Sequence, residues 1–136
     1  MNRCVVFCSD AYTALGLIRS LGESKHIVDV ISYGNCDYLL SSKYVNYGKK
    51  FKSREDALFY LIKDYPLYKE KSILFTIPDP PAYDVDCHLD EMKKKFIVMN
   101  AGKVGGVTQL MRKDYINSIA KHCGLNIPMT TIVKKN

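Results

Sequence analysis

The sequence contains no tryptophan and no long hydrophobic run. A membrane-spanning helix needs about 20 mainly apolar residues, so no such helix is predicted. The apolar stretch that starts at Cys4 is too short for a signal peptide, and we interpret it as a strand. The cysteines are odd in number and scattered, which predicts reduced thiols in a cytoplasmic protein. They are Cys4, Cys8, Cys36, Cys87 and Cys123.

The glycine-rich fingerprints of nucleotide binding are also missing. The segment after the first predicted strand contains one glycine, Gly16, which lies well inside the following predicted helix. A dinucleotide pyrophosphate needs glycines at the strand-to-helix turn itself, so NAD binding is not expected. Residues 102–106 do not match the phosphate-loop pattern, and we interpret them as a connector.

No metal site is predicted from the spacing of the metal-binding residue types. Cys4 and Cys8 lie four residues apart on the first predicted strand, which separates them by about 13 Å, too far to share one zinc ion. Cys87 and His88 are adjacent but have no second pair of ligands nearby.

The net charge is +6, and the lysines are dispersed in short clusters at 49–50, 93–95 and 134–135. Such clusters are typical of solvated faces. A nucleic-acid groove would instead have basic residues interleaved with aromatic residues along one face, and no such pattern is present. Neither nucleic acid nor a membrane is therefore expected as a partner.

Strand and helix patterns alternate along the chain. Residues 4–8 predict a buried strand, Ser9 and Asp10 predict helix caps, and Ala11 to Leu21 recur at helical spacing up to a stop at Gly22. Residues 26–32 predict a second strand. A strand, helix and strand within about 30 residues favour a parallel pair joined by a right-handed crossover.

The remaining elements extend this alternation. We expect strands at 44–47, 72–77 and 96–99, a helix capped by Ser53 that ends before Pro66, a polar helix at 84–95, and a helix at 108–123 ended by Gly124. One face of the last helix is expected to be buried, through Met111, Tyr115, Ile116, Ile119, Ala120 and Cys123.

The predicted fold class is a Rossmann-like, three-layer α/β/α domain with a mainly parallel sheet at residues 1–107, followed by a helix and exit segment at 108–136. Ligands of such sheets lie beyond the carboxyl ends of the strands. Residues 9–12, 33–35 and 78–80 should therefore share one edge. Tyrosines near that edge are candidates for stacking on a base or sugar, namely Tyr38, Tyr44 and Tyr47.

Three segments together resemble the domain that precedes the catalytic domain in ATP-grasp carboxylate–amine ligases of the D-aspartate ligase-like subgroup. They are SDAYTALGLIRSLG at 9–22, SKYV at 42–45, and LMRKDY at 110–115 followed by AKHCGLNIPMT at 120–130. Arg112 stands where the family usually has an aspartate, whereas the interval from Lys113 to Gly124 is as in the family. The resemblance covers nearly the whole chain.

The resemblance implies a role for this chain and for particular residues. The whole enzyme would use ATP and Mg²⁺ to join a small-molecule carboxylate to an amine through an acyl phosphate. Lys113 would contact the ATP phosphates, and Asp10 and Tyr12 would face the acceptor substrate. Further candidates on the substrate side are Ser42, Lys43 and Asp79.

The resemblance also implies that this chain carries no catalytic residue and binds no cofactor tightly, because the ATP-grasp domain would begin after residue 136. The missing domain is then its main partner, and a homodimer is a further option. Two alternatives stay open: a stand-alone Rossmann- or flavodoxin-like module that binds a small molecule or nucleotide, and part of a glycosyltransferase.

Overall fold

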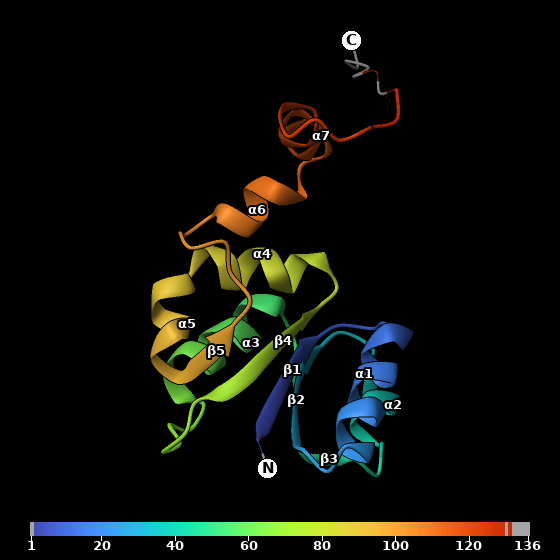
Figure 1. Ribbon diagram of the computed structural model, residues 1–136. Coiled ribbons are helices and arrows are strands. Elements are labelled where there is room, and N and C mark those ends of the chain that lie inside the picture. Colours follow the sequence, from blue (N-terminus) through green and yellow to red (C-terminus); the bar gives the residue numbers. More distant parts are fainter. Residues whose placement is uncertain (1, 130, 132–136) are drawn as a thin grey trace.

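The computed structural model describes residues 2–129 and residue 131. Its centre is a five-stranded sheet in which every pair of neighbouring strands is parallel, with the strand order β3-β2-β1-β4-β5 (Figure 1). The predicted α/β fold with a parallel, helix-flanked sheet is confirmed. The strands are β1 (Arg3–Cys8), β2 (Ile27–Tyr33), β3 (Val45–Phe51), β4 (Ser72–Ile77) and β5 (Phe96–Val98).

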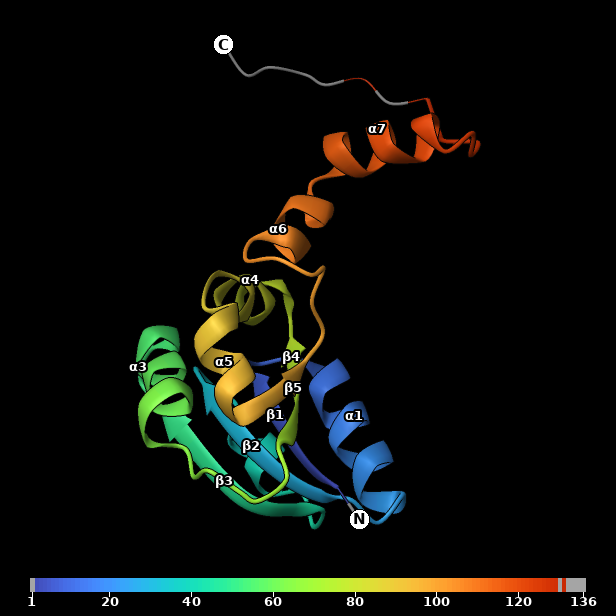
Figure 2. The same ribbon diagram turned by 60° about the vertical axis from the view of Figure 1, so that its left-hand side comes forward.

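Helices cover both faces of the sheet, as parallel strands require (Figure 2). On one face, α1 (Tyr12–Glu23) and α2 (Asp37–Leu40) pack on a cluster that contains Val6, Val28 and Val30. On the other face, a larger cluster includes Val5 and Phe7. It is covered by α3 (Arg54–Phe59), the short π-helix η1 (Tyr60–Asp64) and α5 (Leu89–Lys95).

Helix α1 starts and ends differently from the prediction. Its N-cap residue is Ala11, and no side chain caps its first turn, so the predicted caps Ser9 and Asp10 are wrong. Gly22 lies inside the last turn rather than after it, and a Cβ there would come within 2.4 Å of the Tyr44 side chain. The helix needs glycine at this point for close packing, and Lys25 takes the left-handed φ of +61° instead.

The second half of the chain confirms some boundaries and corrects others. Ser53 caps α3 by accepting a hydrogen bond from the Asp56 N–H at 3.0 Å, as predicted. Strand β3 runs on to Phe51 rather than ending at residue 47, because pairing with β2 carries its polar residues into the sheet. The predicted helix 84–95 is two helices, α4 (Asp79–Cys87) and α5, which meet at His88.

The predicted helix at 108–123 is also two helices, α6 (Gly106–Met111) and α7 (Lys113–His122), with Arg112 extended between them. No α7 residue is buried, so the expected buried face is wrong. Ile116 and Ile119 are 42% and 37% exposed. Figures 1 and 2 show the reason: α6 and α7 extend away from the sheet, so α7 has no layer of the domain to pack on.

Among the described residues, no helix is long and apolar enough to span a bilayer.

Candidate functional site

The strand order creates a crevice at the carboxyl edge of the sheet. The chain leaves β1 towards β2 on one side, whereas β4 lies on the other side of β1, so the connections after β1 and β4 diverge. This is the position at which open parallel sheets bind ligands. The Ser9 N–H donates to the Ile77 carbonyl at 3.2 Å, which ties the two strand ends together at the base of the crevice. The predicted edge segments 9–12, 33–35 and 78–80 all lie here.

A polar group stands on the rim of this crevice. The Tyr38 hydroxyl donates to Asp10 Oδ1 at 2.8 Å, and the Tyr12 ring lies 6.0 Å from the Tyr38 ring. Partial desolvation and the bond to Asp10 raise the pKa of Tyr38 to about 12. The hydroxyl therefore stays protonated at neutral pH. Tyr12 is 85% exposed, which leaves its ring available to a ligand.

An apolar cavity of about 400 Å³ lies beside this rim, against the carboxyl half of β4. Leu17 of α1, Phe75 and Ile77 of β4, and Met111 of α6 contribute to its walls. Asp79, at the start of α4, is the charged group among the described residues that line it. Pro80 and Pro81 follow in the first turn of α4, where proline is tolerated because those N–H groups have no helical partner. The cavity suits an apolar group with a polar end.

Two aspartates of α4 have partners at this edge that the sequence pattern did not reveal. Arg54 Nε lies 2.7 Å from Asp84 Oδ2, as a charge contact without an aligned hydrogen bond. Desolvation raises the pKa of Asp84, and the charge of Arg54 opposes that rise. Asp86 accepts hydrogen bonds from the N–H groups of Val107 and Thr108 at 3.2 and 2.7 Å, which fastens α6 to α4.

Two buried cysteines, Cys8 and Cys36, lie at this edge. Cys8 ends β1 and is buried, and burial together with the nearby Cys36 thiol raises the pKa of Cys8 to about 12. A thiol must be deprotonated to attack a substrate or to bind a metal. Cys36 donates instead to the carbonyl of Tyr33 at 3.4 Å. The raised pKa makes Cys8 a poor nucleophile at neutral pH.

The other candidates lie elsewhere. Ser42 and Lys43 precede β3, so they lie at the amino edge of the sheet, where Lys43 lines a cavity of about 350 Å³ with His26 and Tyr44. They are therefore not brought together with Asp10, Tyr12 and Asp79. Of the three tyrosines expected near the ligand edge, only Tyr38 is there. Tyr44 and Tyr47 are at the amino edge, because β3 begins at Val45.

Lys113 is exposed at the start of α7, beyond the edge of the sheet. The break before it is held by Arg112, whose guanidinium binds the Asp114 carboxylate at 2.6 and 3.3 Å. Asp114 also lies in the first turn of α7, where the helix dipole stabilises a negative charge. The extended backbone of Arg112 interrupts the helix that the sequence pattern predicted to be continuous.

Within residues 2–129, no group of three or more histidine, cysteine or acidic side chains is arranged to hold a metal ion. Comparison with protein-family models, with curated proteins and with solved structures gave no match.

Proposed function

We propose that this chain is the substrate-side domain of an ATP-dependent carboxylate–amine ligase, and that α7 leads into the domain that binds ATP. The observation that carries the proposal is the position of helix α7, which extends away from the sheet instead of packing on either of its faces (Figures 1 and 2). None of its residues is buried, and Ile116 and Ile119 remain partly exposed. An amphipathic helix gains its stability mainly by packing its apolar side, so α7 needs a surface that this domain does not provide.

The position of α7 relative to the crevice also supports the proposal. Asp86 fixes α6 to α4, and Met111, the last residue of α6, lines the apolar cavity. A domain packed on α7 would therefore stand over the carboxyl edge and close the crevice from above. In this arrangement Asp10 and Tyr12 face the acceptor substrate, and the Lys113 ammonium reaches the phosphates of ATP.

The described residues supply one wall of the proposed active site, and no group of three or more histidine, cysteine or acidic side chains among them is arranged to hold a metal ion. Magnesium, which would offset the charge of the triphosphate, needs carboxylates that the proposal assigns to the second domain. The work of this chain is then to orient the acceptor substrate and to exclude water from the crevice. The Tyr38 hydroxyl, held as a donor to Asp10, fixes the position of that carboxylate.

The proposal predicts where activity will be found. The protein extended by the next domain of its reading frame should release phosphate from MgATP when amine and carboxylate mixtures are added, whereas the 136-residue chain should not. In the extended protein, Lys113→Ala should raise the KM for ATP about ten-fold or more, because a lysine near phosphates makes a charge-assisted contact. Lys121→Ala, on the same helix, is the matched control. Equal effects of the two substitutions, or no phosphate release by the extended protein, would contradict the proposal.

A further inference from the structure

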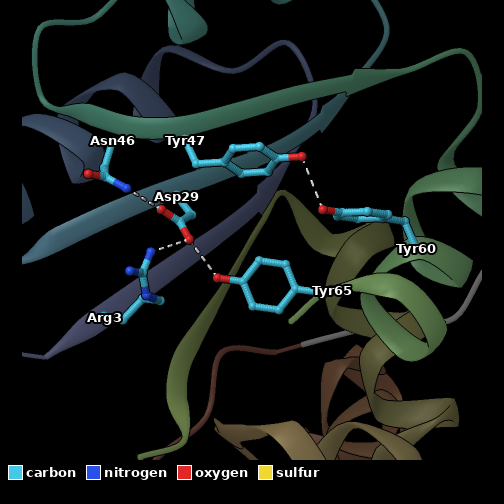
Figure 3. Close-up of polar contacts among 6 residues, drawn as sticks. All are labelled: Arg3, Asp29, Asn46, Tyr47, Tyr60 and Tyr65. Carbon is cyan, nitrogen blue, oxygen red and sulfur yellow. Dashed lines mark hydrogen bonds and ion pairs between the residues drawn. The ribbon is translucent and has the colours of Figure 1, made fainter. Parts of the chain in front are cut away.

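A polar pocket that the proposed function does not use lies at the amino edge of the sheet. This amino-edge pocket has a volume of about 340 Å³ and is built from β1, β2, β3, the first residue of η1 and the segment that follows η1. Figure 3 shows its principal side chains, which point towards one another from these parts of the chain. They are Arg3, Asp29, Asn46, Tyr47, Tyr60 and Tyr65.

A buried carboxylate forms the floor of this pocket. Asp29 is 1% exposed, and its Oδ2 accepts hydrogen bonds from Arg3 at 2.7 Å and from the Tyr65 hydroxyl at 2.6 Å. Its Oδ1 has a single long contact among the described residues, with Asn46 Nδ2 at 3.4 Å. A carboxylate oxygen accepts about two hydrogen bonds, so Oδ1 retains capacity for a further donor.

Aromatic rings form the walls. The hydroxyls of Tyr47 and Tyr60 are 3.1 Å apart, and the Tyr60 and Tyr65 rings pack edge to face with their centroids 6.2 Å apart. Burial and the bond to Asp29 raise the pKa of Tyr65, so its hydroxyl remains a donor to the carboxylate. Tyr47 is 40% exposed and stands at the mouth. Walls of this kind favour a flat ligand, because aromatic faces stack on planar rings.

The charges of the pocket restrict the ligand further. Arg3 pairs with Asp29, and Lys49 Nζ lies 4.1 Å from the centroid of the Tyr60 ring. The pocket therefore has no excess of negative charge to attract a cation. An anion would meet the buried carboxylate at the floor, at a high cost of desolvation. An uncharged ligand with N–H donors avoids both penalties.

We propose that the amino-edge pocket binds an uncharged planar heterocycle that carries an amino group, such as a nucleobase. The amino group donates to Asp29 Oδ1, and the Asn46 amide N–H donates to the adjacent ring nitrogen, which is one half of the bidentate contact that asparagine makes with adenine. The ring stacks on Tyr47. The site lies at the opposite edge of the sheet from Asp10 and α7, so this inference is independent of the proposed function.

The test uses 9-methyladenine as the probe and 9-methylpurine, which lacks every N–H donor, as its matched control. We expect 9-methyladenine to shift the backbone amide resonances of Asn46, Tyr47 and their neighbours in a saturable titration. The dissociation constant for 9-methylpurine should be at least ten-fold larger. Equal binding of the two compounds, or no saturable shift at the solubility limit of 9-methyladenine, would overturn the proposal and leave the cluster with a structural role alone.

Two variants locate the site while keeping both members of the buried ion pair, Arg3 and Asp29. Tyr47→Ala and Asn46→Ala, both at exposed positions, should each weaken 9-methyladenine binding about ten-fold while the amide spectrum stays folded. Tyr12→Ala, which removes an exposed tyrosine at the carboxyl edge, should leave the affinity unchanged. A loss of affinity in Tyr12→Ala as large as in Tyr47→Ala would place the ligand at the other edge and refute the assignment.

Discussion

Asp29 at the amino edge of the sheet and Tyr12 at the carboxyl edge differ in how deeply their side chains are buried. At the amino edge, Asp29 is buried and bound by Arg3 and Tyr65, which come from distant parts of the chain. On the rim of the carboxyl edge, Tyr12 is 85% exposed and lies in a loop-to-helix junction. Removing a buried group leaves its partners unsatisfied, whereas removing an exposed group returns its partners to water. Replacing Asp29 should therefore affect folding, whereas replacing Tyr12 should affect ligand binding alone.

The largest effect is expected from Asp29→Ala. The substitution leaves the Tyr65 hydroxyl buried without its acceptor and Arg3 without its counter-charge. We expect the free energy of unfolding to fall by about 3 kcal/mol, measured by urea denaturation. Asp37→Ala is the control, because Asp37 also pairs with a basic residue, Lys50, but on the surface. A similar loss in both variants would break the comparison.

Asp86→Ala tests whether burial matters more than position, because Asp86 is 3% exposed although it lies towards the carboxyl edge. Its loss leaves two N–H groups of α6 without their acceptor. We expect a local cost of about 2 kcal/mol, seen as faster amide hydrogen exchange at Val107 and Thr108. The exposed Asp90 provides a control substitution. Unchanged exchange at Val107 and Thr108 would show that other contacts hold α6 in place.

The stability of the protein should depend on pH through the raised pKa of Asp84. Desolvation raises its pKa in the folded protein above the unfolded value, so the folded state binds the proton more tightly. Its contribution to stability is therefore greatest below the unfolded pKa, and falls as the pH rises through the folded pKa. We expect the wild-type protein to lose stability relative to Asp84→Asn over this range, measured by urea denaturation at several pH values. A difference that stays constant with pH would refute the shift.

The smallest effect is expected from Tyr12→Ala. Because most of this side chain is in water, its removal should leave the melting temperature unchanged. The same substitution should weaken ligand binding in the crevice of the extended protein, measured as a higher KM for the acceptor substrate. A clear loss of stability would instead give Tyr12 a structural role at the carboxyl edge.

The sequence pattern predicted the elements whose signals are local. Short apolar or β-rich runs located all five strands, although the end of β3 was missed. Ser53 identified the start of α3, because a capping side chain bonds within its own helix turn. The pattern also placed residues 9–12, 33–35 and 78–80 at one edge, since parallel strands end together. It failed at Ser9, Asp10 and the continuous last helix, where partners from other elements, or their absence, decided the outcome.

By itself, the sequence determined that this chain forms a parallel α/β sheet, because hydrophobic periodicity is a property of neighbouring residues. Only the tertiary structure decided that Asp29 is the floor of a pocket, since its partners Arg3 and Tyr65 are 26 and 36 residues away. Likewise, the exposed face of α7 depends on which surfaces lie within its reach. Contacts between distant segments form only in the folded chain, so a local sequence pattern cannot predict them.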